Sequence, residues 1–343
     1  MSSLPLLPLP DKPQLVGIAR LAAEGESLRE GHNVEYFTLP AKSLLNRCVS
    51  GRQMPFTWTI NPYRGCEFAC KYCYARYTHE FMEMRDGVDF EQKIYVKQHA
   101  ANLLRHDLHR VKPGEAIALG TATDPYQPTE RRYEVTRGIL EEFARHRGYE
   151  LGIVTKSNLI ARDLDLLQEV AKTNKLSVHI TITTLNADLA RILEPRAPRP
   201  DLRLDAVRAL SQGGLRVGVS ASPVLPGITD SPADLEALVR AAAEAGADHV
   251  FANPLFLKPC SAAVFLPFLE QNFPALVENY RQRYQGRSFL PEAYAKRLSQ
   301  LIHRFREKYK ISRADRRGER GTEHPAHATK WPVQEFDQQL DLF

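Results

Sequence analysis

Short apolar runs alternate with amphipathic stretches between about residues 57 and 253. The apolar runs have the length and the β-branched residues of buried strands. The stretches between them repeat apolar residues at three- and four-residue spacing, which predicts helices that each bury one face. The predicted strands are 57–60, 116–120, 151–155, 177–183, 215–221 and 249–253, and the clearest predicted helices are 102–110, 130–147, 158–171, 202–210 and 233–245.

This repeat of strand and helix indicates the fold class. From the second predicted strand onward, each strand follows the last by roughly 30 residues, which is about the length of one β–α unit. Such units side by side form a parallel sheet with helices outside it. The six predicted strands are fewer than the eight of a closed TIM barrel. We therefore predict an α/β fold, a partial (β/α)6 TIM-like barrel of parallel strands, with its functional site at the carboxyl ends of the strands.

After Pro259 the pattern becomes helical, which predicts a C-terminal helical appendage. Within residues 292–310 the apolar side chains repeat at spacings of three and four, so they share one stripe. The stripe consists of Tyr294, Leu298, Leu301, Ile302, Phe305 and Tyr309, and the cations Arg297, Arg304 and Lys308 fall on another face. This helix could dock by its apolar stripe and present the cations outward.

The two ends of the chain lack this periodicity, which suggests four segments. The first residues are rich in proline, and residues from 313 onward are polar. We expect an N-terminal extension at 1–50, a barrel core at 51–260, a helical basic subdomain at 261–312 and a flexible tail at 313–343.

Composition and charge narrow the functional class. The chain has 343 residues, of which 43% are hydrophobic and 25% are charged, as in ordinary globular proteins. The net charge is +5, but residues 281–320 alone hold 13 Lys and Arg against four Asp and Glu. Such a basic tract predicts a polyanion site, with nucleic acid as the expected partner of Arg297, Arg304 and Lys308. A solvated helix face is the alternative explanation.

Nothing in the sequence predicts a membrane protein. No stretch approaches the roughly 18 uninterrupted apolar residues of a membrane-spanning helix. The apolar start is interrupted by prolines and lacks a basic leader, so we expect no signal peptide. We therefore expect a cytoplasmic protein.

Three of the five cysteines lie within eight residues, at Cys66, Cys70 and Cys73. Three soft ligands on one short loop are typical of an iron–sulfur cluster or of zinc. A [4Fe–4S] cluster held by three cysteines would keep one iron without a protein ligand, open to a substrate or cofactor. A structural zinc site with His79 as its fourth ligand is the alternative.

The CxxxCxxC pattern with Tyr72 before its third cysteine, placed after the first strand of a repeated β–α chain, resembles the radical S-adenosylmethionine (SAM) superfamily. The longer string NPYRGCEFACKYCYAR, together with TDPYQPTE at 123–130, resembles one branch of it. That branch contains the spore-photoproduct-lyase-like proteins, often labelled DNA repair photolyases. The resemblance covers about residues 40–260.

The resemblance implies a cofactor pair and a reaction. Cys66, Cys70 and Cys73 would ligate a [4Fe–4S] cluster, and SAM would chelate the fourth iron. An electron donor of the flavodoxin or ferredoxin type would reduce the cluster. Cleavage of SAM would then release methionine and a 5′-deoxyadenosyl radical, which abstracts hydrogen from the substrate. For this branch the expected substrate is nucleic acid, in a lyase-like DNA repair reaction.

By the same resemblance, the SAM-binding residues would lie at the carboxyl ends of the strands. These candidates are Tyr72, Thr123, Asp124, Lys156, Thr181, Thr183 and Asn253, with Glu194 and Arg196 beyond the fourth strand. Each residue also has a plain structural explanation. Tyr72 could be a packing residue, Asp124 a turn residue before proline and Lys156 a solvated cation, while threonine is a common strand former.

One position departs from the branch. Spore photoproduct lyases carry a hydrogen-donating cysteine near the end of the second strand, whereas the matching residues 121–124 contain no thiol. Cys260 could reach the cavity from the far end, but Cys48 and Cys260 could equally be buried and inert.

Two other functions stay open from the sequence. One is radical SAM modification of RNA, a peptide or a metabolite. The other, from a different class, is a non-catalytic metal-binding accessory protein of repair complexes. Formation of 5′-deoxyadenosine would separate an enzyme from such a binding protein.

The last five residues resemble the QL(S/D)LF peptide with which bacterial replication and repair proteins bind the sliding clamp. Leu342 and Phe343 could enter a preformed apolar pocket, while Gln339 supplies directional hydrogen bonds and Leu340 completes the motif. The sequence therefore predicts a bacterial sliding clamp as a second partner.

Overall fold

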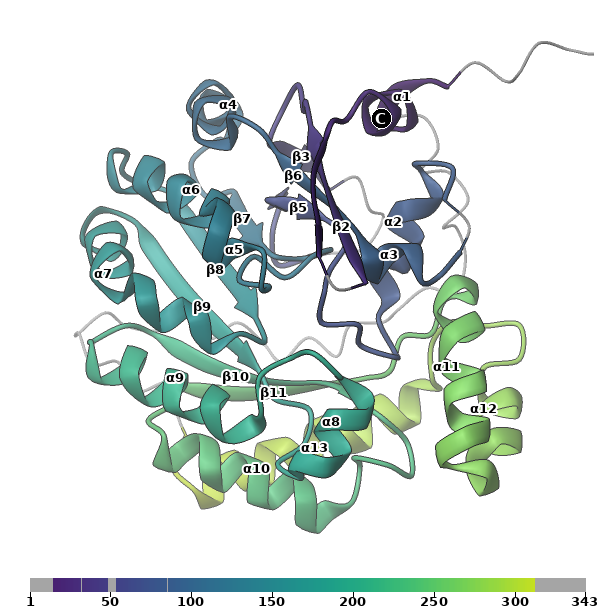
Figure 1. Cartoon of the computed structure of the whole chain (residues 1–343). Coiled ribbons are helices and arrows are strands. Elements are labelled where there is room, and N and C mark those ends of the chain that lie inside the picture. Colours follow the sequence, from purple (N-terminus) through teal and green to yellow (C-terminus); the bar gives the residue numbers. More distant parts are fainter. Residues whose placement is uncertain (1–14, 32, 49–53, 85, 312–343) are drawn as a thin grey trace, which may run out of the picture.

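The computed structural model of the chain describes residues 15–31, 33–48, 54–84 and 86–311 (Figure 1). A large curved sheet lies at its centre, with helices along its outer side, and a smaller sheet lies near its open edge. Two helices near the end of the described chain, α11 and α12, stand apart from the large sheet, beside the small sheet's helices.

The large sheet has seven strands in the order β11-β10-β9-β8-β7-β4-β3. Six of them run parallel, and β3 pairs antiparallel with β4 at one edge. The six parallel strands are those predicted, so the partial barrel is confirmed. Their bounds are β4 Trp58–Ile60, β7 Ala116–Leu119, β8 Glu150–Thr155, β9 Lys175–Thr181, β10 Val217–Val224 and β11 His249–Pro254, with β3 at Leu45–Arg47.

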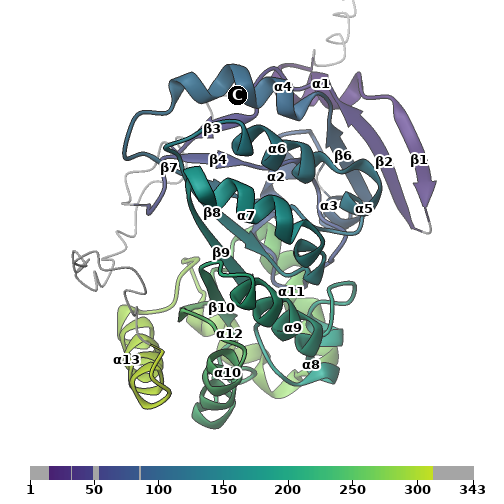
Figure 2. The same cartoon turned by 90° about the vertical axis from the view of Figure 1, so that its left-hand side faces the viewer.

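Helices cover the outer side of this sheet, as Figures 1 and 2 show. The apolar residues of the strands alternate, and those on the outer side, such as Leu151 and Ile153, are fully buried under the helices. Each such side chain stabilises the fold by roughly 1.5–3 kcal/mol. The outer helices are α4 Ala100–Asp107, α6 Val135–Ala144, α7 Leu164–Thr173, α9 Pro200–Gln212, α10 Pro232–Glu244 and α13 Glu292–Lys308, and η2 Leu108–Arg110 follows α4.

Two predicted helices are divided. The predicted helix 130–147 breaks at Glu134, which has a left-handed backbone with φ of 49°, so α5 (Glu130–Tyr133) precedes α6. The carboxylate of Glu130 accepts hydrogen bonds from the backbone N–H groups of Thr136 and Arg137, at 2.9 and 3.0 Å. A buried side chain thus caps the start of α6 from the preceding helix. The predicted helix 158–171 likewise begins as a 3₁₀ helix, η3 (Asn158–Asp163).

The second sheet was not predicted. Its strand order is β1-β2-β6-β5, and β2 runs parallel to β6. Residues 1–50 were expected to form an N-terminal extension with little periodicity, and the described part of that segment contains one helix and three strands. The domain boundaries themselves stay predictions. The bounds are α1 Gly17–Ala23, β1 Ser27–Gly31, β2 Val34–Leu39, β5 Tyr63–Arg64, α2 Tyr77–Glu80, α3 Asp89–Gln92 and β6 Lys93–Lys97.

The C-terminal helices occupy two places. Helix α13 packs against α10 and β11, and its stripe buries Leu298 and Ile302 as predicted. Helices α11 and α12 instead pack around the loop that holds the three clustered cysteines. The remaining bounds are η1 Tyr74–Arg76, α8 Ala187–Leu193, α11 Pro259–Asn272, η4 Pro274–Leu276 and α12 Val277–Arg283. None of the helices in the described ranges is both long and apolar enough to cross a bilayer.

Candidate active site around the cysteine loop

The three clustered cysteines lie on the loop of residues 65–73, which follows β5 and ends at η1. The loop starts at Gly65, whose backbone has a φ of +81°. A Cβ at this position would lie 2.6 Å from the carbonyl oxygen of Lys93. The next residue, Cys66, donates its N–H to the carbonyl of Phe90 at 2.8 Å. Only glycine therefore lets the chain turn this closely against α3 and β6.

Two buried side chains after β7 hold the start of the loop. Thr123 donates its hydroxyl to the carbonyl of Gly65 at 2.6 Å. The Gln127 amide donates to the same carbonyl at 3.1 Å and accepts from the N–H of Glu67 at 2.9 Å. Thr123 thus has a clear structural role in the described residues. Its predicted contact with SAM stays a prediction.

The far end of the loop is fixed from three other elements. Arg76 in η1 donates to the carbonyl of Cys70 at 3.0 Å and pairs with Glu91 at 2.8 Å. Ser261 in α11 donates its hydroxyl to the carbonyl of Cys73 at 2.8 Å. The N–H of Lys71 donates to the carbonyl of Leu193 at the end of α8. The loop is therefore held in one conformation by backbone contacts that leave the three sulfur atoms uninvolved.

The thiols themselves are buried and lie near one another. Cys66 and Cys70 are buried and Cys73 is partly buried. Burial raises the pKa of all three thiols. The negative charge of Cys73 also raises the pKa of Cys66 and of Cys70. A metal centre would be needed to hold them as thiolates at neutral pH.

Tyr72, between the second and third cysteines, donates its phenol to the carboxylate of Glu194. Glu194 follows α8 and forms a fully buried ion pair with Arg203 of α9. Burial alone would raise the pKa of Glu194, but Arg203 and Lys156 lower it, so the carboxylate stays ionised. The Tyr72 ring belongs to the apolar cluster under the loop, so its packing role is real.

Lys156 follows β8, and its side chain lies beside Tyr72 of the cysteine loop. Its ammonium lies 5.7 Å from the centre of the Tyr72 ring. Burial alone would lower the pKa of Lys156, but the charges of Cys70 and Glu194 raise it. It is therefore a partly buried cation at the cysteine loop and not a fully solvated one. A carboxylate ligand could bind there.

Asp124 joins the ends of two strands. Its carboxylate accepts from the Thr155 hydroxyl at 2.6 Å and from the N–H groups of Lys156 and Tyr126 at 2.7 and 2.9 Å. Burial raises the pKa of Asp124 despite these three bonds. The bond to Tyr126 is that of a turn residue, as the structural explanation predicted. The same carboxylate also fixes the position of Lys156.

The other candidates divide into two groups. Thr183 donates its hydroxyl to Glu194 at 3.1 Å, which brings it to the site. Thr181 is buried in β9, and its carbonyl accepts from Arg203 at 3.1 Å. Asn253 is exposed at the end of β11 and donates its amide to the Ser222 hydroxyl at 3.3 Å. Within the described residues, the hydrogen bonds of Asn253 go to Ser222 and not to the cysteine loop.

His79 lies on α2 and packs against β6 of the small sheet. Its ring packs edge-on against Phe90 and Tyr95, and its Nε2 lies 3.1 Å from the carbonyl of Lys93. Burial lowers the pKa of His79 to about 4. In this arrangement the imidazole is engaged in the core, and it is not a fourth ligand to the three thiols among the described residues.

Residues 60–242, more than half of the chain, match the family model described as Radical SAM superfamily. The chain belongs to the radical SAM superfamily. An uncharacterized protein of Mycobacterium tuberculosis is 37% identical over 280 residues, which cover 81% of this chain and 82% of the relative. An uncharacterized protein of Methanocaldococcus jannaschii is 29% identical over 68% of this chain and 83% of its own.

Solved structures of spore photoproduct lyase have the same fold as this radical SAM protein. A mutant of that lyase with bound AdoMet and dinucleoside spore photoproduct matches with a TM-score of 0.59. The match covers 80% of this chain and 79% of the lyase, at 16% sequence identity. A second structure, complexed with dinucleoside spore photoproduct, matches with a TM-score of 0.58.

Membership of the superfamily implies an enzyme that uses SAM and a [4Fe–4S] cluster. Among the described residues, no three His, Cys, Asp or Glu side chains converge as they would around a single ion. A [4Fe–4S] cluster has a different requirement, because each protein-bound iron takes its own thiolate. Cys66 and Cys70, which are buried, and Cys73, which is partly buried, lie on one loop and fit that requirement. When bound, the cluster supplies the electron that cleaves SAM.

The buried ion pair of Glu194 and Arg203 at this site was not predicted from the sequence. Arg203 lies in the predicted helix 202–210, where a lone cation normally faces water. Its side chain is instead 1% exposed, and that of Glu194 is 0% exposed. Glu194 was only a further candidate, yet it contacts Tyr72, Thr183 and Arg203. No local pattern marks a buried ion pair, since its partners come from separate elements.

The predicted nucleic-acid residues lie elsewhere, on α13. Arg297 and Arg304 are exposed there, but Lys308 pairs with Glu236 of α10. Lys308 is therefore engaged within the protein, while the two arginines are open to solvent. Their role stays a prediction. The clamp-like residues Gln339, Leu340, Leu342 and Phe343 lie outside the described residues.

Proposed function

We propose that this protein is a radical SAM enzyme that acts on nucleic acid, in a lyase-like DNA repair reaction. The observation that supports the chemistry is the loop that carries two buried thiols and one partly buried thiol beside the partly buried cation Lys156. Two observations support the substrate class. The fold is that of a spore photoproduct lyase bound to a dinucleoside photoproduct, and residues 281–320 carry a strong excess of positive charge.

The chemistry would come from the bound cofactors. A [4Fe–4S] cluster held by Cys66, Cys70 and Cys73 would pass one electron, taken from a donor of the flavodoxin or ferredoxin type, to SAM, and the cleaved SAM would supply the species that takes a hydrogen atom from a substrate carbon. The protein binds SAM, orients the reacting carbon and excludes water and wrong hydrogen donors.

The residues around the cysteine loop have distinct tasks in this proposal. Lys156 binds the SAM carboxylate, because it is a partly buried cation beside Tyr72 whose neighbours keep it charged. Asp124 positions Lys156 through the backbone N–H of that residue. Tyr72 is positioned by Glu194 and offers a ring close to where the adenine would lie. Thr181, Thr183 and Asn253 complete the proposed SAM contacts at the carboxyl ends of β9 and β11.

The experiment is anaerobic incubation of the reconstituted protein with SAM, dithionite and candidate nucleic acids. Both 5′-deoxyadenosine and altered nucleosides are followed by mass spectrometry. We expect one oxygen-sensitive [4Fe–4S] cluster, SAM cleavage and a modified nucleoside. Formation of 5′-deoxyadenosine with a peptide or metabolite but with no nucleic acid would refute the substrate class. Visible absorption without a cluster, and no 5′-deoxyadenosine, would favour a non-catalytic binding protein.

Cysteine variants test the cluster itself. Cys70→Ala is expected to lose iron and to abolish SAM cleavage. Cys260→Ala is the matched control, because Cys260 lies at the start of α11, outside the cysteine loop, and its loss removes one thiol as well. It should retain iron and SAM cleavage. Full iron content and normal cleavage in Cys70→Ala would make the assignment wrong.

A further inference from the structure

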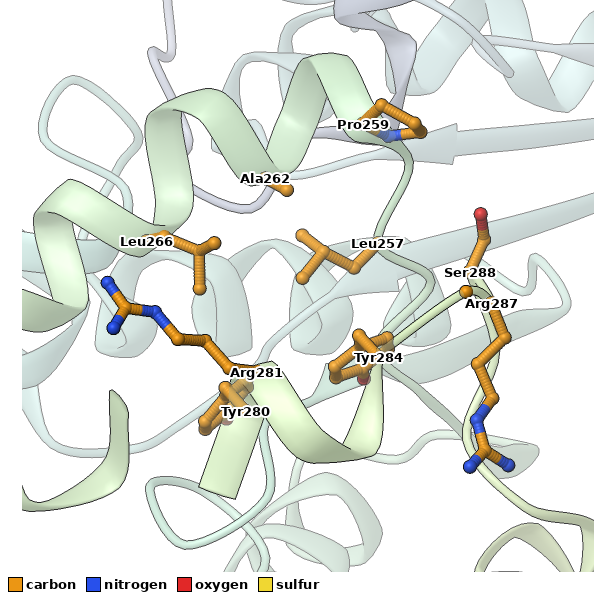
Figure 3. A pocket seen from close by; sticks show the side chains of 10 residues that line it. Leu257, Pro259, Ala262, Leu266, Tyr280, Arg281, Tyr284, Arg287 and Ser288 are labelled. Atoms are coloured by element: carbon orange, nitrogen blue, oxygen red, sulfur yellow. The ribbon is translucent and has the colours of Figure 1, made fainter. Parts of the chain in front are cut away.

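A pocket of about 440 Å³ lies between α11 and α12, outside the barrel (Figure 3). This volume falls within the roughly 300–1,000 Å³ of small-molecule sites. One wall comes from α11 and the segment before it, and the other comes from α12 and the segment after it. The lining residues used below are Leu257, Ala262, Leu266, Tyr284, Arg281 and Arg287.

The inner surface of the pocket is apolar and aromatic. Tyr280 and Tyr284 stack with their ring centres 6.0 Å apart and an interplanar angle of 17°. Their hydroxyls donate to the carbonyls of Pro226 and Leu255, both at 2.9 Å, so these polar ends are satisfied within the protein. The Tyr284 ring, Leu266 of α11 and Leu257 before α11 are left to line the pocket. Such a surface suits a flat, weakly polar group.

Two arginines flank this surface. Figure 3 shows Arg281 on the Leu266 side of the pocket and Arg287 on the Ser288 side. Arg281 pairs with Glu270 at 2.7 Å, but both side chains are about half exposed, so the pair is weak and open to competition. Arg287 is exposed and has no carboxylate partner in the described part of the chain.

We propose that this pocket holds one unstacked base of a nucleic-acid strand, with the phosphates on its two sides bound by Arg281 and Arg287. The inference rests on the proposed function and names a contact site for its substrate. Aromatic rings stack on unpaired bases with little regard to sequence. Guanidinium groups bind phosphate through paired hydrogen bonds. An apolar floor between two cations matches the alternation of base and phosphate along a strand.

The pocket also lies next to the cysteine loop. Leu257 and Tyr280 belong to the apolar cluster that contains Cys66 and Cys70. Helix α11 lines the pocket with Ala262 and contacts the loop through the hydrogen bond from Ser261 to Cys73. A strand held in the pocket would therefore pass beside the loop. The held base is not the reacting one, and its binding positions the strand.

The test compares two pairs of arginine substitutions in the full-length reconstituted protein. Binding of an end-labelled single-stranded DNA is measured by fluorescence anisotropy over a range of salt, without SAM or reductant. Arg281→Gln with Arg287→Gln is expected to weaken binding about tenfold and to flatten the slope of log K against log salt by about 1.4. Arg147→Gln with Arg216→Gln removes the same charge from exposed positions before β8 and β10, at the amino ends of the strands, and is expected to change affinity less than about twofold.

A second pair of variants tests the aromatic surface. Tyr284→Phe keeps the ring and should bind as the unchanged protein does. Tyr284→Leu removes the stacking surface and should weaken binding about fivefold or more without changing the salt slope, because stacking releases no counterions. Circular dichroism and thermal unfolding of the two variants show whether both are folded.

The oligonucleotide itself is also varied. The single strand should bind more tightly than the intact duplex, because the pocket requires an unstacked base. An RNA strand of the same sequence tests whether the site distinguishes ribose from deoxyribose. Tight binding of either the DNA strand or the RNA strand supports the proposed site.

Three results would overturn the inference: no binding by the unchanged protein, equal loss in the two arginine pairs, or no effect of Tyr284→Leu. Binding that behaves as expected, in a protein that modifies no nucleoside, would instead refute the proposed function and leave the pocket standing.

Discussion

The phenol of Tyr72 donates to the carboxylate of Glu194, which lies 122 positions further along the chain. This bond ties the middle of the cysteine loop to the segment after α8. The same carboxylate pairs with Arg203 and accepts from Thr183. Glu194 thus connects three elements: the cysteine loop, the end of the fourth parallel strand and helix α9.

Glu194→Gln is expected to destabilise the protein more than Arg203→Met does. Without the carboxylate, the fully buried Arg203 and the partly buried Lys156 would both remain as cations, and an uncompensated buried charge costs about 3–5 kcal/mol. In Arg203→Met the carboxylate of Glu194 still has Lys156 as a nearby cation. The charge of Lys156 already lowers the pKa of Glu194. Anaerobic urea unfolding of the cluster-free protein measures both free energies.

The exposed pair of Arg199 and Asp201 supplies the control for that comparison. Arg199→Met should change the free energy of unfolding by less than about 1 kcal/mol, because an exposed ion pair contributes little. Equal losses in Glu194→Gln and Arg203→Met would mean that Lys156 does not compensate the carboxylate.

Gly65→Ala is expected to cost about 2–4 kcal/mol and to reduce iron loading. The cost has two sources, a left-handed backbone and a Cβ placed 2.6 Å from the carbonyl oxygen of Lys93. Gly114→Ala is the matched control, since Gly114 has a similar φ of +85° with nothing within 4 Å of its Cβ. It should cost only about 1 kcal/mol and leave iron loading unchanged. If both variants behave alike, the close contact at Gly65 is unimportant.

The free energy of unfolding should fall on acidification from pH 6.5 toward pH 4. His179 on β9 lies with its Nε2 3.0 Å from the Nε2 of His249, and burial lowers its pKa to about 4. The unfolded chain, with an ordinary histidine pKa near 6.5, binds the proton first. Stability is therefore full above pH 6.5, declines below it and stops changing once His179 is protonated in both states.

The expected slope from this histidine is at most about 1.4 kcal/mol per pH unit. Burial likewise lowers the pKa of His79 to about 4, so His79 adds a similar slope. His179→Gln should therefore remove about half of the decline and leave the rest, as measured by denaturant unfolding at a series of pH values. A decline of unchanged steepness in this variant would mean that His179 titrates normally in the folded protein.

A peptide covering residues 331–343 is expected to bind a bacterial sliding clamp with roughly micromolar affinity. Burial of Leu342 and Phe343 would contribute about 3–6 kcal/mol before ordering costs. Fluorescence anisotropy of the labelled peptide with purified clamp measures the affinity. No saturation below about 100 μM, or binding that survives replacement of both residues by Ala, would refute this interaction.

Local patterns were enough to predict the six parallel strands of the large sheet, but not its edge strand β3. The parallel strands are short apolar runs spaced by one β–α unit, and each was predicted to within a few residues. The small sheet escaped prediction because its strands carry polar and charged residues, such as Lys93 and Lys97 in β6. Its pairing of β2 with β6 joins residues that are more than 50 positions apart, which no local window contains.

The sequence by itself determined the barrel and the cysteine loop. Strand spacing and the spacing of Cys66, Cys70 and Cys73 are properties of adjacent residues, and the chemistry of three thiols follows from them. Only the tertiary structure decided how the site is held together, through Gln127 at the start of the loop and Glu194 with Arg203 behind it. A buried charge is stable only where its partner is brought to it. That partner is set by which helix packs on which loop, and the order of residues does not reveal it.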